Sequence, residues 1–116
     1  MQNLDQLRAA HALAAAPTTD KSSVAKLPGM ILTNGLLATL SFACEEGKES
    51  RLKMKAAADA LAQHLAHILP EAGGATTGTN LGANLARRND ALALQRATTE
   101  ALSYLSYLKR FAEKKD

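Results

Sequence analysis

The chain is poor in the residues that build sheets and covalent frameworks. Its 116 residues include no Trp, two Tyr, two Phe and a single cysteine. β-Branched residues are scarce apart from Thr, so a sheet would have few of the side chains that strands favour. One cysteine excludes an internal disulfide and points to a reducing compartment. The composition therefore disfavours a sheet and excludes a disulfide-stapled scaffold.

Long hydrophobic runs and strong charge are also missing. The apolar run Met30–Cys44 is shorter than the roughly 20 residues that a membrane-spanning helix needs. No charged segment followed by an apolar one opens the sequence, so we expect no signal peptide. The net charge of +3 favours anionic partners only weakly. We expect a cytoplasmic protein that makes no membrane contact.

Alanine and leucine supply most of the apolar content, and both favour helix. The length fits one domain, so we predict an all-α fold: a single-domain helical bundle of five or six helices over residues 1–116. Pro70 to Asn80 contains three glycines and no helical pattern, which predicts a mobile loop near residues 70–80. The spacing of apolar residues predicts helical segments at Gln2–Ala16, Ser23–Lys26, Gly29–Glu45, Arg51–Leu69, Leu81–Arg88 and Ala91–Lys114.

The most apolar stretch, Lys26–Phe42, should form the centre of the core because a helix that is apolar on most sides is usually buried. Pro28 either begins this central helix or kinks a longer one, and the sequence leaves both readings open. The residues of this stretch that we expect in the core are Ile31, Leu36, Leu37, Leu40 and Phe42.

Asn34 is the oddest position in the central helix, because a buried amide requires hydrogen-bond partners. It either bonds the backbone of a neighbouring helix or faces the surface of a partner. Gly35 beside it would let another backbone approach closely. Both residues are therefore candidates for contact with another chain.

No set of catalytic or metal-binding residues emerges. His64 and His67 are three apart on one helix, but a metal site needs three or four ligands of defined geometry. We interpret them as structural or solvated residues. Cys44 follows an apolar helix and precedes Glu45, which predicts a buried, unreactive thiol.

The last predicted helix carries a basic, partly aromatic face. Arg96, Tyr107, Arg110 and Lys114 lie together at helical spacing, with Lys109 alongside. This face is either an ordinary solvated surface or a surface that contacts phosphates.

Two segments of the sequence indicate a protein family, which the composition alone does not. Lys26–Phe42 (KLPGMILTNGLLATLSF) resembles a Lys-Leu-Pro-x-Met-Ile-x-x-Asn-Gly-Leu pattern, and Glu100–Glu113 (EALSYLSYLKRFAE) resembles a closing Leu-Lys-Arg-Phe-Ala-Glu pattern. Both are similar to the signature blocks of the small α-helical Cmr subunit of type III-B CRISPR RNA-guided effector complexes (the RAMP module). The chain length, the order of the blocks and the predicted all-helical class agree with this resemblance.

The resemblance implies a non-catalytic structural subunit of an RNA-guided, RNA-targeting antiviral complex. Such subunits would stack head-to-tail in a filament and contact the backbone of the guide–target RNA duplex, where base pairing supplies the specificity. The implied partners are other Cmr subunits, further copies of the chain, CRISPR guide RNA and target RNA. We expect no enzyme activity, no metal, no cofactor and no small-molecule substrate.

The candidate residues follow from the basic positions and from the two blocks. For subunit contact they are Asn34, Gly35 and Tyr107. A second hypothesis is a stand-alone helical adaptor that binds a partner protein and no nucleic acid. The predicted RNA-binding residues are Lys26, Lys53, Arg96, Lys109 and Arg110.

Overall fold

Six α-helices and three short 3₁₀ turns account for the fold in the computed structural model, which describes residues 3–47 and 49–113. The described residues form no strand, and only an isolated bridge joins Asp20 to Glu113. The prediction of an all-α bundle is confirmed. The α-helices are α1 (Leu4–Ala15), α2 (Lys21–Asn34), α3 (Leu36–Ala43), α4 (Leu52–Ile68), α5 (Gly78–Arg87) and α6 (Ala91–Phe111), and the 3₁₀ turns are η1 (Ala16–Thr18), η2 (Glu49–Arg51) and η3 (Pro70–Ala72).

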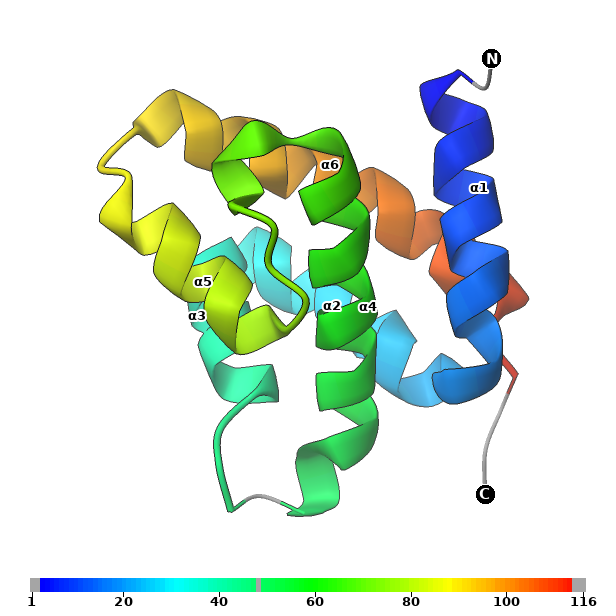
Figure 1. Cartoon of the computed structure of the whole chain (residues 1–116). Coiled ribbons are helices and arrows are strands. Elements are labelled where there is room, and N and C mark those ends of the chain that lie inside the picture. The colour runs from blue at the N-terminus through cyan, green and yellow to red at the C-terminus, as the bar shows by residue number, and fades with distance from the viewer. Residues whose placement is uncertain (1–2, 48, 114–116) are drawn as a thin grey trace.

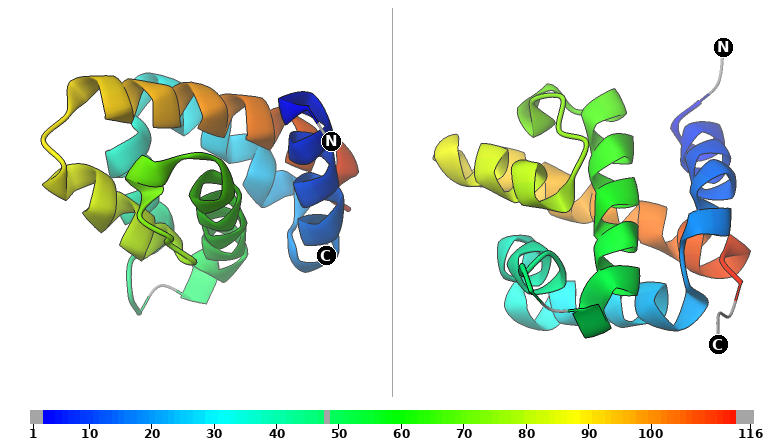
Figure 2. Two further views of the ribbon diagram at one scale, coloured as in Figure 1. Left: turned by 45° about the horizontal axis from the view of Figure 1, so that its top comes forward. Right: turned by 60° about the horizontal axis from the view of Figure 1, so that its bottom comes forward.

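The long helix α6 organises the bundle. It packs against α1, α2 and α4, while α5 packs against α3 and α4 (Figure 1). Figure 2 shows α6 running along one side of the molecule, with α1 at its carboxyl-terminal end and α4 crossing it. The side chains at this crossing are fully buried, and each buried Leu contributes roughly 1.5–3 kcal/mol. The largest are Leu61, His64, Leu65, Tyr104, Leu105 and Leu108.

Polar caps begin the helices where the sequence places them. The Asp20 side chain accepts from the backbone N–H of Ser23 at the start of α2, and Asp90 accepts from Leu92 and Ala93 at the start of α6. Such a carboxylate satisfies N–H groups that have no partner inside the helix.

The predicted bounds of the central helix are wrong at both ends. Instead of a short segment at Ser23–Lys26 and a long helix at Gly29–Glu45, α2 runs from Lys21 to Asn34 with Pro28 in its interior. Pro28 therefore does not begin a helix. The break comes seven residues later, at Gly35, where α2 ends and α3 begins.

Gly35 explains the position of the break. Its φ of +91° and ψ of 162° lie in a region that only glycine adopts readily. Its N–H closes α2 by donating to the Ile31 carbonyl at 2.8 Å, and its own carbonyl accepts from the Thr39 hydroxyl at 2.8 Å in α3. One residue thus ends one helix and starts the next.

The glycine-rich segment is shorter than predicted, because α5 begins at Gly78 and not at Leu81. The Thr77 hydroxyl caps this helix by accepting from the Asn80 N–H at 3.1 Å. Gly78 is buried, and a Cβ there would lie 2.6 Å from the Cys44 sulfur. The close approach of α5 to α3 and α4 therefore requires glycine at this position.

Candidate nucleic-acid interface

The carboxyl-terminal turn of α6 carries two exposed cations, Lys109 and Arg110. Positive side chains are favoured there because the last carbonyls of a helix are unpaired and partly negative. Among the described residues, neither side chain forms a salt bridge. Lys114, which the sequence placed on the same face, lies outside the described residues. The two side chains are available to an anionic partner.

The amino-terminal half of α2 lies beside this turn. The backbone N–H of Lys21 donates to the Glu113 carbonyl at 3.0 Å, and α2 runs antiparallel to α6 (Figure 2). Lys26 is exposed on α2, on the stripe opposite the buried Val24, Leu27 and Ile31. The structure therefore brings Lys26, Lys109 and Arg110 to the same end of the α2–α6 pair.

Arg96 does not belong to this group. It lies 14 positions before Arg110 on α6, which is about 21 Å along the helix. Its Nε donates to Glu71 Oε2 at 2.8 Å. Hydrogen bonds from the Glu71 backbone N–H and from Arg96 lower the pKa of the Glu71 carboxyl. Arg96 remains half-exposed, but the Glu71 carboxylate partly compensates its charge.

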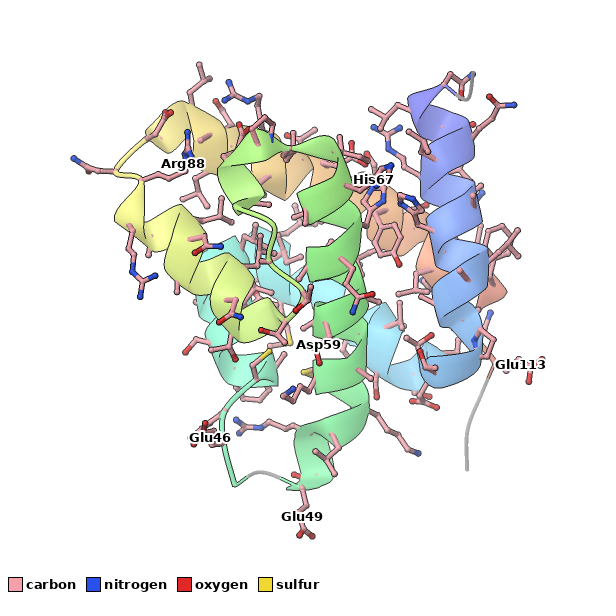
Figure 3. The ribbon with its side chains drawn as sticks, in the orientation of Figure 1. Glu46, Glu49, Asp59, His67, Arg88 and Glu113 are labelled. Carbon is pink, nitrogen blue, oxygen red and sulfur yellow. The ribbon has the colours of Figure 1, made fainter. Side chains whose placement is uncertain are left out.

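Lys53 lies elsewhere again, in the first turn of α4. That end of the molecule also carries Glu46 and Glu49, which Figure 3 shows beside the start of α4. Lys53 is exposed, and charges of both signs surround it, because Arg51 and Lys55 lie two residues away on either side. Lys53 and Arg96 therefore do not share one surface with the cations at the end of α6.

Tyr107 connects two helices of the same chain. Its hydroxyl donates to Asp5 of α1, and this hydrogen bond raises the pKa of Tyr107. Its ring centroid lies 6.2 Å from that of Phe111. The phenol thus fixes α1 to α6, while its role in subunit contact stays a prediction.

The corner between α2 and α3 is exposed, contrary to the prediction of a buried helix. Asn34 and Gly35 are both exposed, so the reading of Asn34 as a buried amide is wrong. Leu32 is 75% exposed and Phe42 is 40% exposed, so the prediction of Phe42 in the core is also wrong. The Arg51 guanidinium covers the Phe42 ring at 3.6 Å from its centroid. Of the predicted core positions, Ile31, Leu36 and Leu40 are buried.

A buried polar cluster that we did not predict from the sequence holds α1, α4 and α6 together. Glu100 of α6 is 6% exposed. Arg8 of α1 donates to both of its carboxylate oxygens, at 2.8 and 2.7 Å. The Nε2 atom of His64 in α4 lies 2.8 Å from Oε2 of the same carboxylate. The Glu100 carboxylate is therefore buried and paired within the fold.

The electrostatics of this cluster favour an ionised Glu100 and a neutral His64. Burial alone would raise the pKa of Glu100, but the hydrogen bonds from Arg8 and His64 outweigh it and lower that pKa. Burial lowers the pKa of His64, and the bond to Glu100 only partly offsets this effect. The ion pair between Arg8 and Glu100 is structural, because it joins α1 to α6 inside the fold.

The sequence contained a signal for this burial. Glu100 shares a helical face with Ala93, Ala97 and Tyr104, all of which are buried. A charged residue on the core face of an amphipathic helix requires a partner. That partner, Arg8, is 92 positions away, so local periodicity could not identify it.

Other chemistry has little support in the described part of the chain. No group of three or more His, Cys, Asp or Glu residues there is arranged to hold a metal. Cys44 is buried as predicted, and burial raises the pKa of its thiol. Within residues 3–47 and 49–113, no helix is both long enough and apolar enough to cross a membrane.

Comparison with known proteins agrees with the resemblance found in the sequence. A family model described as CRISPR-associated protein (Cas_Cmr5) matches residues 4–115, which include both signature blocks. No curated protein and no solved structure matches the chain at a significant level. The family match covers almost the whole chain and confirms the resemblance to the small Cmr subunit. The chain belongs to the Cas_Cmr5 family of CRISPR-associated proteins, which form the small subunit of the type III-B Cmr complex.

Proposed function

We propose that this Cmr subunit is a non-catalytic component that stacks in a filament and contacts the backbone of the guide–target RNA duplex. The observation that carries the proposal is the group of exposed cations Lys26, Lys109 and Arg110 at one end of the α2–α6 pair. Most other described arginines differ, because Arg8, Arg51 and Arg96 are paired with carboxylates. Repetition of a few phosphate contacts along a filament would add up to substantial affinity.

Stacking would use a different part of the surface. The corner formed by Leu32, Asn34 and Gly35 presents an exposed apolar side chain, that of Leu32, next to exposed backbone. Large apolar side chains that stay exposed in one chain are common at protein interfaces. We assign this corner to contact with a neighbouring subunit of the complex, in line with the predicted roles of Asn34 and Gly35.

Charge reversal at the end of α6 tests the RNA contact. The double variant Lys109→Glu/Arg110→Glu should weaken binding of target RNA by the assembled complex, most strongly at low salt. Each phosphate contact that is lost should reduce the slope of log affinity against log salt by about 1. The measurement is a salt series of binding isotherms with complexes whose subunit composition has been verified.

A matched control is available on α5. Arg87 and Arg88 are exposed, and Figure 3 shows Arg88 on the opposite side of the molecule from Glu113. Arg87→Glu/Arg88→Glu makes the same change in net charge and should leave binding nearly unchanged. Equal losses in both double variants would show a general charge effect and refute the assigned surface, as would unchanged affinity in the α6 variant.

The adaptor hypothesis predicts a different result in a pull-down from cells. Recovery of this chain with CRISPR RNA and other Cmr subunits supports the proposed role. Recovery with a partner protein, but with neither RNA nor those subunits, supports the adaptor.

A further inference from the structure

A groove separates α1 from α4, and its floor belongs to α6. It has a volume of about 620 Å³. His11 and Ala14 line it from α1, Ala60, His64 and His67 line it from α4, and Tyr104 lines it from α6. Figure 3 shows His67 on the side of α4 that faces α1. None of the residues assigned to RNA or subunit contact lines this groove.

Two stacked rings form the inner wall of the groove. The rings of His64 and Tyr104 lie nearly parallel, with centroids 4.3 Å apart, and both side chains are almost completely buried. The Tyr104 hydroxyl has no hydrogen-bond partner among the described residues. A buried hydroxyl without a partner is unfavourable. A molecule that brings a hydrogen-bonding group to the floor of the groove would satisfy it.

The histidines give the groove a defined hydrogen-bonding pattern. Since the Glu100 carboxylate only accepts, His64 carries its proton on Nε2 and its Nδ1 is an acceptor. His11 Nδ1, 2.7 Å away, must then donate to it. This tautomer leaves Nε2 of His11 as an acceptor. His67 lies edge-on to His11, with ring centroids 4.9 Å apart.

The electrostatics of the groove select against phosphate. Among the described residues no lysine or arginine lines it, whereas Asp59 does, with its carboxylate paired to Lys55 Nζ at 3.1 Å. Burial lowers the pKa values of His11 and His64, which keeps both rings neutral near pH 7. The remaining wall consists largely of alanine methyl groups, from Ala14, Ala15, Ala56 and Ala60. The groove suits a neutral, planar ligand that carries both donors and acceptors.

We propose that the groove between α1 and α4 binds a nucleobase, held by the imidazoles of His11 and His67 and by the hydroxyl of Tyr104. Unpaired bases are recognised by contact with aromatic side chains and by hydrogen bonds to their edges. The volume accommodates a base with its ribose. The proposal rests on the proposed function only in naming RNA as the source of the base. That base would belong to an unpaired stretch outside the guide–target duplex, and a free nucleotide carries the same group.

Two variants with one control test the groove in the isolated chain. Ala14→Phe places a ring in the groove, while Ala25→Phe makes the same change at an exposed position of α2 outside it. Tyr104→Phe removes only the hydroxyl, which has no partner in the described chain, so this variant should fold normally. The probes are the four nucleosides, ribose 5-phosphate and a single-stranded oligoribonucleotide.

Nucleosides should shift the NMR signals of the His11 and His67 ring protons, and ribose 5-phosphate should not. Ala14→Phe should weaken oligoribonucleotide binding by about five-fold or more, the loss expected for one base contact. Tyr104→Phe should weaken nucleoside binding, and Ala25→Phe should leave both affinities within about two-fold of the wild type, well inside that loss.

Nucleosides that leave the histidine signals unchanged at millimolar concentration would overturn the proposal, as would equal losses in Ala14→Phe and Ala25→Phe. An oligoribonucleotide that binds no more tightly than a nucleoside would refute RNA as the source and identify a free nucleotide as the ligand. Lys109 and Arg110 do not line the groove. Charge reversal there leaves it intact, so failure of the proposed duplex contact is distinguishable from failure of this site.

Discussion

Replacing Gly35 by alanine isolates the cost of a single backbone conformation. At φ +91° and ψ 162°, a Cβ atom at Gly35 would meet nothing within 4 Å, so the change introduces no clash with another residue. The cost therefore comes from local strain, which is about 1–3 kcal/mol for a residue held in such a region. For a chain of this length we expect a fall in the melting temperature of about 3–12 °C.

Gly29 supplies the matched control on the same helix. It lies inside α2, and a Cβ there would also meet nothing within 4 Å. Since Gly29 has helical geometry, Gly29→Ala should stabilise the fold by about 0.5–1 kcal/mol through the reduced freedom of the unfolded chain. Urea unfolding of both variants, followed by circular dichroism, measures the two effects with opposite signs.

A Gly35→Ala variant as stable as Gly29→Ala would refute the break between α2 and α3. That result would mean that residue 35 has helical geometry, as it would in the continuous central helix that the sequence alone predicted. A loss for both variants would instead show that α2 does not tolerate a side chain on this surface.

The buried cluster yields further predictions. Glu100→Ala should lower the free energy of unfolding by about 3 kcal/mol, because Arg8 and His64 would lose their partner inside the fold; a loss below about 1 kcal/mol in urea unfolding would contradict the burial seen here. Stability should fall as the pH drops below about 6.5, the ordinary pKa of histidine. In that range the unfolded chain takes up protons that the folded His11 and His64, with lowered pKa values, resist. Each of these histidines contributes at most about 1.4 kcal/mol per pH unit. The lowered pKa of Glu100 adds a further loss only at pH values near and below its ordinary pKa of about 4.3. Urea unfolding at pH 7.5, 6.5 and 5.5 should show the histidine slope in the wild type and a smaller one in His11→Gln. Identical slopes in the two proteins would exclude His11 as a contributor.

Local sequence features predicted the helices and several of their ends. Alanine and leucine spacing indicated an all-α bundle. The caps Asp20 and Asp90 are local features too, because each accepts from backbone N–H groups only two or three residues away. The Asn-Gly pair at 34–35 is a turn signal. The high hydrophobicity around it led to the wrong prediction of a continuous helix.

The candidate interface was predictable only in part. Exposure of Lys109 and Arg110 follows from the periodicity of α6, so the sequence could identify them. The pairing of Arg96 with Glu71 brings together residues that are 25 positions apart, and no pattern within one helix predicts it. The side chains that line the groove between α1 and α4 come from three helices, and only their packing makes a site.

The sequence by itself determined the helical class, the family and the positions of most helices, because propensity, capping and motif order act within a few residues. Tertiary structure alone decided which charges are free and which are buried. Whether an arginine is available to an anionic partner depends on the carboxylate that packing places beside it, as the contrast between Arg8 and Arg110 shows. Desolvation and ion pairing act through space, so they could be assigned only after α1, α4 and α6 had been placed together.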